Sequence, residues 1–251
     1  MKSFCMVLSL ASVMVAPAVF ASMSVTLIDD TSKYSYGSGG EFRAVGNAGL
    51  DAIVDWAAYS TATKGTISSA TDISSWGYNS SMNGQQYFQT FCIEANEYFS
   101  PGTSYSVGIS PNAMYGSQPP NGDPISIGTA WLYSQFAAGT LSGYTYTYGS
   151  SRASATSAGA LQEAIWWLED ESGGVKNSFV TAAETALSLN DTTIKNNANG
   201  AYGVYALNLG NPGAVQDQLV IVPEATTMVA GALLLLPLGA STLRILRRKR
   251  E

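Results

Sequence analysis

The chain contains no histidine among its 251 residues. This absence excludes Ser-His-Asp and Cys-His catalysis, zinc sites with imidazole ligands and any mechanism that uses imidazole as the general base. Cysteine is almost as rare, with two residues, so a cysteine cluster for zinc or iron–sulfur is excluded as well. No glycine-rich phosphate loop followed by lysine is present. We therefore expect no metal, no cofactor and no enzymatic activity.

Charged residues make up only 12% of the chain, and their two signs are unevenly distributed. Residues 22–222 carry six Lys or Arg against sixteen Asp or Glu, a net charge of minus ten. Such a surface repels nucleic acid and anionic lipid, so we expect neither as a partner of this region. The abundance of Gly, Ser, Thr, Asn and Tyr suits an extracellular β-rich protein in carbohydrate-rich surroundings.

The C-terminal segment has the pattern of a membrane anchor. Residues 225–243 are uncharged, and at a rise of about 1.5 Å per residue we expect them to form a transmembrane helix long enough to cross a hydrocarbon core. A basic cluster follows directly, comprising Arg247, Arg248, Lys249 and Arg250. Basic residues beside a span stay in the cytoplasm, so everything before Pro223 is expected on the other side of the membrane.

The N-terminal segment agrees with export. Residues 1–21 combine a basic start at Lys2, an apolar stretch at 7–15 and small residues up to Ala21, which is the pattern of a cleaved signal peptide. Cleavage removes Cys5 and leaves Cys92 as the only cysteine of the exported chain. An intramolecular disulfide is therefore excluded.

Residues 222–251 join three features in a fixed order: the box Val222-Pro223-Glu224, with Ala225 in place of a second proline, then the apolar helix, then the basic end. This tail resembles the PEP-CTERM sorting signal of Gram-negative bacteria. The resemblance implies recognition by an exosortase-type membrane protease, with the protein held first in the inner membrane and then delivered to the cell surface or extracellular matrix. An ordinary single-pass anchor that is never processed is the alternative.

Residues 22–221 read as one β-rich ectodomain. Alternating or β-branched patterns predict strands at residues 24–27, 41–45, 52–56, 87–94, 104–109, 202–206 and 219–221. Helical spacing predicts helices at residues 126–138, 157–170 with Ser157 as the N-cap, and 178–189 with Asn190 at its end. Tyr144, Tyr146 and Tyr148 alternate as on a half-buried strand face. We expect a mainly β fold, either a sandwich or a barrel, with a small helical subdomain.

Two short segments carry candidate chemistry: Phe91-Cys92-Ile93-Glu94 on a predicted strand and Leu161-Gln162-Glu163-Ala164-Ile165-Trp166 on a predicted helix. Together they resemble the thioester domains of bacterial surface adhesins. The resemblance implies that Cys92 supplies the sulfur and Gln162 the acyl group of an internal thioester, which an amine or hydroxyl of a partner then attacks. Because such a bond must be kept from water, Phe91, Trp131 and Trp166 are candidate shielding residues.

A wider set of segments, including Gly39-Gly40-Glu41-Phe42 and residues 128–133, resembles the ectodomain of a group of exported PEP-CTERM proteins without a settled activity. This second resemblance implies a role at the surface or in the matrix and names no substrate. The expected partner is a polysaccharide or a surface amine or hydroxyl. Two alternatives to the thioester adhesin remain open. One is a passive structural protein of a biofilm matrix with a free, buried cysteine. The other is a carbohydrate-active enzyme that uses carboxylates such as Glu94 and Glu97.

Overall fold

The computed structural model describes residues 22–29, 35–36, 39–114, 122–147, 152–211 and 215–223. The predicted signal peptide, the predicted membrane helix at 225–243 and the basic end lie outside these residues. Within the described part of the chain, no helix is long and apolar enough to cross a membrane. The main hydrophobic core draws its buried residues from Val25 through Ile221. These buried residues span almost the whole of residues 22–223, so we expect this segment to fold on its own.

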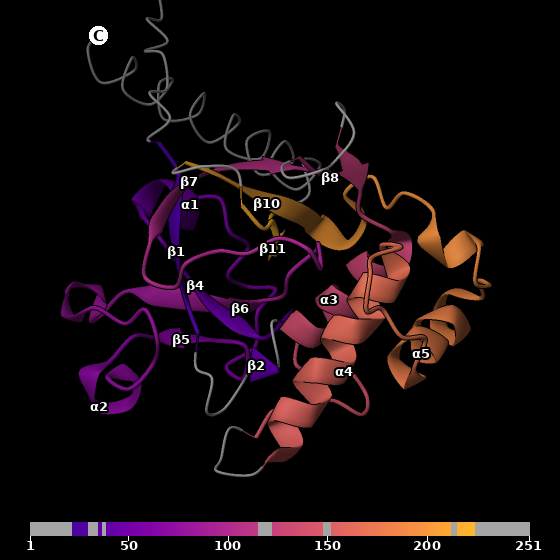
Figure 1. Ribbon diagram of the computed structural model, residues 1–251, viewed down its shortest axis with the longest axis horizontal. Helices are drawn as coiled ribbons and strands as arrows, with labels where there is room; N and C mark the ends of the chain where they lie inside the picture. Colours follow the sequence, from indigo (N-terminus) through magenta and orange to yellow (C-terminus); the bar gives the residue numbers. More distant parts are fainter. Residues whose placement is uncertain are drawn as a thin grey trace, which may run out of the picture.

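Seven strands form one sheet (Figure 1). All of their pairings are antiparallel. In spatial order the strands are β11 (Gln218–Ile221), β10 (Val204–Asn211), β7 (Ser104–Ser110), β1 (Ser24–Ile28), β4 (Phe42–Gly46), β6 (Gln86–Thr90) and β5 (Lys64–Thr66). The β-rich fold predicted from the sequence is confirmed.

The chain just beyond the end of β6 pairs with β11, which lies at the opposite edge of the sheet. Cys92 forms an isolated antiparallel bridge with Gln218 of β11. On either side of the bridge, Ile93 N–H donates to Asp217 O at 3.1 Å and Leu219 N–H donates to Phe91 O at 3.2 Å. We call residues 91–93 and 217–219 the seam. It joins two strands that stand far apart in the sheet order, so the sheet curls toward a closed barrel, and Cys92 lies at the junction.

Two short hairpins accompany the sheet. One pairs β2 (Ser35–Tyr36) with β3 (Gly39–Gly40), and the other pairs β8 (Asn112–Ala113) with β9 (Asp123–Pro124). The β2–β3 hairpin packs against helix α4 (Arg152–Leu168). This contact brings the glycine pair of β3 to the middle of the helix.

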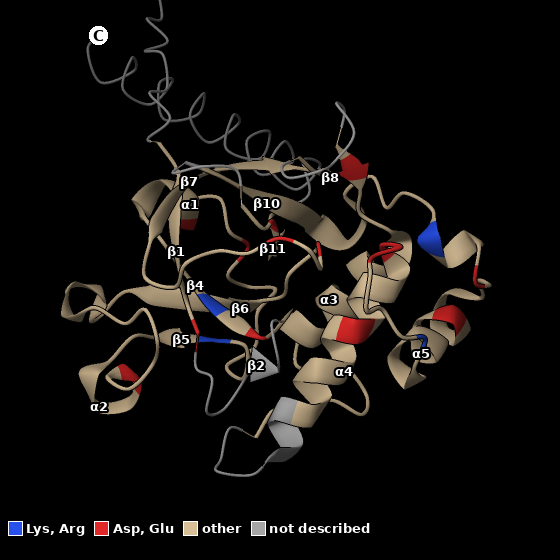
Figure 2. Cartoon of the chain, viewed as in Figure 1, with Lys and Arg blue, Asp and Glu red and all other residues tan. Residues whose placement is uncertain are grey.

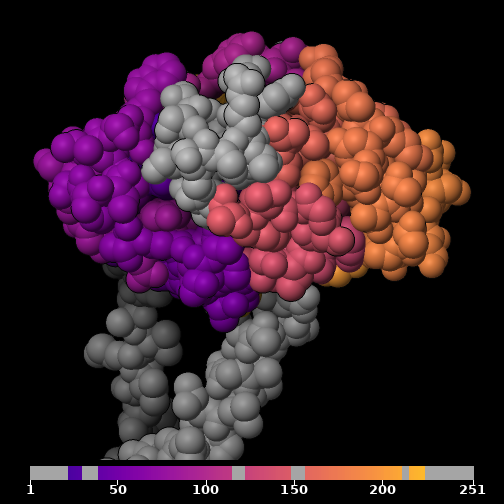
Figure 3. All heavy atoms as spheres, turned by 90° about the horizontal axis from the view of Figure 1, so that it is seen from below, coloured from indigo at the N-terminus to yellow at the C-terminus, as the bar shows by residue number. Residues whose placement is uncertain are grey.

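Three longer helices gather on one side of the sheet (Figure 1). They are α3 (Ile127–Ala137), α4 and α5 (Ser178–Leu187). Short helices α1 (Ala48–Asp51) and α2 (Ser69–Asp72) and the 3-10 turns η1 (Ser80–Met82), η2 (Thr193–Lys195) and η3 (Ala201–Gly203) fill connections. In Figure 3 the N-terminal half in purple and the helices in pink to orange lie side by side in one continuous body.

Helix α3 anchors the helices to the seam. Ser126 caps its first turn by accepting from Thr129 N–H at 3.1 Å. Tyr133, buried on this helix, places its hydroxyl 2.9 Å from Gln89 O and 3.1 Å from Leu219 O. One side chain therefore touches both strands that meet at the seam, which fixes the helices relative to Cys92.

The predicted helices at 126–138 and 178–189 are confirmed apart from their ends, whereas the predicted strand at 52–56 is wrong. That segment follows α1 as a series of turns. Trp56 Nε1 donates to Asp51 O at 2.9 Å, which stabilises the turns locally. An alternating apolar pattern suits such a half-buried turn as well as it suits a strand.

The predicted N-cap of α4 is also wrong, because the helix begins at Arg152 rather than after Ser157. Ser157 lies inside it and accepts from Thr145 N–H at 3.2 Å, so its hydroxyl serves a neighbouring loop instead of a helix end. Tyr144 and Tyr146 lie in that loop and not on a strand, and Tyr148 lies outside the described residues.

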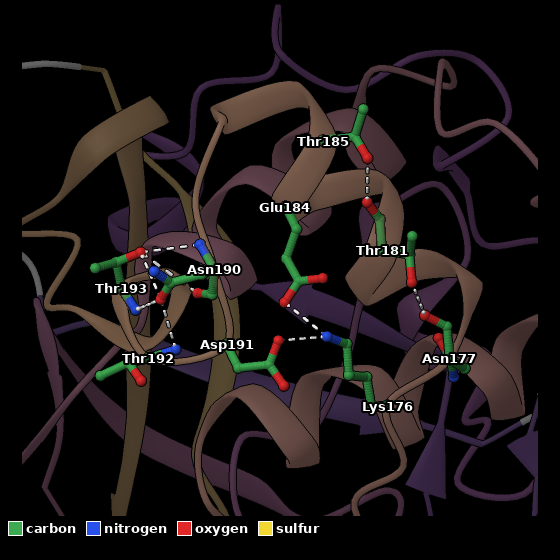
Figure 4. A network of polar contacts seen from close by, with 9 residues as sticks. All are labelled: Lys176, Asn177, Thr181, Glu184, Thr185, Asn190, Asp191, Thr192 and Thr193. Carbon is green, nitrogen blue, oxygen red and sulfur yellow. Dashed lines mark hydrogen bonds and ion pairs between the residues drawn. The ribbon is translucent and has the colours of Figure 1, made fainter.

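Helix α5 ends at Leu187, two residues earlier than predicted. Ser188 ends it in the left-handed conformation with φ of 55°. Asn190 instead organises the following turn, where its Oδ1 accepts from Thr192 and Thr193 N–H at 3.0 Å each (Figure 4). Beside this turn, Lys176 bridges Glu184 at 2.9 Å and Asp191 at 2.5 Å.

Candidate functional site

Cys92 and Gln162, which are 70 positions apart in the sequence, lie in direct contact. Cys92 is on the seam and fully buried, and Gln162 projects from α4 with 1% of its surface exposed. Gln162 Oε1 accepts from Cys92 N–H at 3.1 Å, and Gln162 Nε2 donates to Cys92 O at 2.8 Å. The side-chain amide thus pairs with the main chain of Cys92 in the way that a neighbouring strand would.

This pairing fixes where the acyl carbon of Gln162 lies. The carbon joins Oε1 to Nε2, and both atoms contact the main chain of one residue, so the carbon lies beside Cα of Cys92. The thiol is carried on the same Cα. The orientation of the amide is also settled, because exchanging its oxygen and nitrogen would set donor against donor and acceptor against acceptor.

A third contact to the amide comes from β3. Gly40 N–H donates to Gln162 Oε1 at 3.1 Å in the buried interior. Gly40 has φ of 122°, in the region that favours glycine. A Cβ on Gly39 would lie 2.7 Å from Gln162 Cγ and 2.7 Å from Trp166 Cη2. Both glycines are thus needed for the hairpin to approach the amide this closely.

The sulfur of Cys92 faces a second glutamine. Gln218 Nε2 donates to Cys92 Sγ at 3.5 Å across the seam. Burial raises the pKa of the Cys92 thiol far above its usual range, the Gln218 hydrogen bond lowers that pKa, and the nearby Glu94 and Asp29 raise it further. The thiol is therefore neutral at neutral pH, and Gln218 is the side chain that favours its thiolate form.

A buried acidic group adjoins the seam. Glu94 is 2% exposed, and its Oε2 accepts from Asp217 N–H at 3.1 Å. Within the described ranges its Oε1 has no hydrogen-bond partner. Burial first, and then the neighbouring Asp217 and Glu97, raise the pKa of Glu94 to about 9. The side chain is consequently a neutral acid at neutral pH, which keeps a full charge away from Cys92.

Two of the three predicted shielding residues adjoin the site. Phe91 is fully buried next to Cys92 and packs edge-on against Phe136, with ring centroids 5.0 Å apart. Trp166 is one turn along α4 from Gln162 and touches the glycine hairpin. Trp131 lies half-buried against the core from α3. The Cys92–Gln162 contact is itself buried, and this burial limits the access of water.

Gly40 and Gln218 were not among the predicted site residues. Gly40 acts through its main chain, and the only signal in the sequence was the neighbouring pair Gly39-Gly40. Gln218 lies on a strand that meets Cys92 only because the sheet closes. Of the predicted sorting signal, Val222 and Pro223 are described directly after β11, whereas Glu224 and the basic residues at 247–250 lie outside the described part.

Two other kinds of site to consider in the described residues are a metal-binding site and a cluster of basic side chains. In the ranges that the structure describes, no group of three or more Cys, Asp or Glu side chains is arranged to hold a metal ion. Figure 2 shows basic residues at only a few places on the part of the chain that is described. Comparison with family models, curated proteins and solved structures gives no match. The site is thus characterised by its geometry: a buried Cys–Gln pair, with two main-chain donors on the glutamine oxygen.

Proposed function

We propose that the protein is an exported surface or matrix protein that forms an internal thioester between Cys92 Sγ and Gln162 Cδ and uses it for covalent attachment. The observation that carries the proposal is the two-way hydrogen bonding of the Gln162 amide to the main chain of Cys92, which holds the acyl carbon against the residue that bears the thiol. Holding two groups in this way replaces a bimolecular encounter by an intramolecular one.

The chemistry balances without an oxidant or a cofactor. In the first step the S–H bond of Cys92 and the C–N bond of Gln162 break, an S–C bond forms, and the thiol proton leaves with the nitrogen as ammonia. In the second step an amine or hydroxyl of a partner attacks the acyl carbon. The product is an amide or ester at Gln162, and the thiol of Cys92 is regenerated.

The sequence supports a route to the surface for this chemistry. Residues 1–21 would direct export, and residues 222–251 would anchor the chain in the inner membrane and present it to an exosortase-type protease. Sorting would leave the ectodomain at the cell surface or in a polysaccharide matrix. The acidic ectodomain suits partners other than nucleic acid.

Intact mass spectrometry of a segment comprising residues 22–222 tests the proposal. We expect a mass below the sequence value by one ammonia, about 17 Da, and addition of methylamine at Gln162 on treatment. Cys92→Ala and Gln162→Ala should each show no ammonia loss and no addition of methylamine. A full mass together with a free thiol that titrates after unfolding would contradict the thioester.

A passive matrix protein is the second candidate. The full burial of Cys92 and the raised pKa of its thiol favour this function, because both make a cysteine inert. The same mass measurement separates the two functions. A passive protein would keep an unmodified Gln162 carboxamide and would not react with methylamine.

A further inference from the structure

Two main-chain donors converge on one side-chain oxygen at the centre of the site. Gln162 Oε1 accepts from Gly40 N–H and from Cys92 N–H, each at 3.1 Å. The donors come from β3 and from the seam, two parts of the chain that only the fold brings together. All three residues are buried, so water does not compete for the oxygen.

These hydrogen bonds satisfy buried main-chain groups and so stabilise the fold, and the same arrangement of donors is the one that acyl transfer requires. When a nucleophile adds to Cδ, the carbonyl oxygen becomes an oxyanion, and preorganised N–H donors in a dry site stabilise that charge strongly. We infer that the N–H groups of Gly40 and Cys92 form the oxyanion hole of this site, with Gly39 as the residue that positions it. The inference rests on the proposed thioester function.

The hydrogen bond made by the nitrogen of the Gln162 amide is consistent with the loss of that nitrogen as ammonia. Gln162 Nε2 donates to Cys92 O at 2.8 Å, which aims the leaving nitrogen away from the two N–H donors. As Sγ adds to Cδ, the electron pair of the C=O bond moves to Oε1 and is held by the two N–H groups. The pair then returns as the C–N bond breaks, and the nitrogen departs as ammonia with the proton from Sγ.

The same oxyanion hole serves the attachment step. A partner amine that adds to the thioester again places negative charge on Oε1, and the Cys92 thiolate leaves. Removing one donor should therefore slow both the formation of the thioester and its reaction with amines. A donor that served only structure would leave both rates unchanged in a chain that still folds.

Gly39 determines whether the Gly40 donor reaches the oxygen. A Cβ at position 39 would overlap Gln162 Cγ and Trp166 at 2.7 Å, so an alanine must push β3 away from α4. Gly108 on β7 offers a matched control, because a Cβ there meets no atom within 4 Å. Gly39→Ala should slow the reaction with methylamine, whereas Gly108→Ala should not.

A backbone substitution tests the donor itself. Cys92 is the only cysteine in residues 22–222, so a synthetic segment 22–91 can be ligated chemically to a recombinant segment 92–222. Placing glycolic acid at position 40 replaces the Gly40 N–H by an ester oxygen and leaves every side chain in place. The all-amide chain made by the same ligation is the control, and near-UV circular dichroism shows that both chains fold alike.

We expect the ester chain to form its thioester and to consume methylamine roughly 100-fold more slowly than the all-amide chain. A folded ester chain that forms no thioester while the control does supports the inference equally. Equal rates in the two chains, or equal rates for Gly39→Ala and Gly108→Ala, would overturn the oxyanion hole and leave the thioester standing. No ammonia loss in the all-amide chain would overturn the proposed function and this inference together.

Discussion

Cys92 and Gln218 face each other across the seam, with Gln218 Nε2 3.5 Å from Cys92 Sγ. Two glutamine amides therefore contact Cys92. The amide of Gln218 contacts its sulfur from the neighbouring strand, and the amide of Gln162 contacts its main chain. The two amides are suited to different tasks. The amide of Gln162 is hydrogen-bonded through both its oxygen and its nitrogen to the main chain of Cys92, which suits an acyl donor, whereas Gln218 Nε2 donates a hydrogen bond to the sulfur.

Replacing Gln218 should therefore slow the chemistry without abolishing it. In Gln218→Leu the departing thiolate of Cys92 loses a hydrogen bond worth about 1.5 kcal/mol, which corresponds to about a tenfold lower rate of reaction with methylamine. A time course of intact mass measures the rate, and fragmentation shows methylamine at residue 162. If Gln218→Leu kept the full mass while Gln162→Leu still lost ammonia, Gln218 would be the acyl donor.

The Gln162 amide should also stabilise the fold when no thioester can form. In a Cys92→Ala background, Gln162→Leu leaves three buried main-chain groups of Gly40 and residue 92 without their partner. We expect unfolding in urea to show a loss of about 2 to 4 kcal/mol. Gln85→Leu in the same background is the matched control, because Gln85 is exposed although its Nε2 donates to Ser81 O. Equal losses in the two variants would contradict the structural role of Gln162.

Stability should fall as the pH rises toward 9. Burial raises the pKa of Glu94 from 4.5 to about 9, so the folded state holds a proton that the unfolded state releases. This contribution is complete below about pH 4.5 and is lost progressively up to about pH 9, at roughly 1 kcal/mol per pH unit. Glu169, with its pKa raised to about 7 by burial, acts in the same direction below pH 7.

Between pH 7 and 9 most of the contribution of Glu169 has already been lost, so the change in stability reports mainly on Glu94. Urea unfolding measured across that interval should show a declining free energy of unfolding in the parent chain. The decline should be much flatter in Glu94→Gln, whose side chain does not titrate, and should persist in Glu169→Gln. A decline that Glu94→Gln leaves unchanged would show that another group is responsible.

The stability of the fold should be more sensitive to the loss of a buried ion pair than to the loss of an exposed one. Arg43 of β4 and Asp72 of α2 form a salt bridge with side chains 5% and 2% exposed. Asp72→Asn removes the charged partner of a buried guanidinium and should lower stability by about 3 to 5 kcal/mol in urea unfolding. Asp191→Asn, which removes one partner of the exposed Lys176, should have little measurable effect. Comparable losses for the two substitutions would contradict this ranking.

The sequence predicts which side chains form the site better than it predicts the contacts that hold them together. Cys92 and Gln162 belong to segments with recognisable side-chain patterns, and the structure brings them into contact. The contributions of Gly40 and Gln218 depend on a main-chain N–H and on closure of the sheet, neither of which leaves a side-chain pattern in the sequence. The strand predicted at 52–56 is wrong for a local reason, because Trp56 Nε1 donates a hydrogen bond to Asp51 O and the segment forms turns.

The seam gives the tail a mechanical connection to the site. β11, the last described strand before Pro223, carries Gln218 and so lies directly against Cys92. Tension on the proposed C-terminal anchor would enter the domain through β11, first at the pairing of Ile221 with Val204 of β10 and last at the bridge of Gln218 with Cys92. A partner bound at Gln162 would pull on α4, which contacts Cys92 through the Gln162 amide. The part of the load that passes β10 would therefore meet the load from the partner at Cys92.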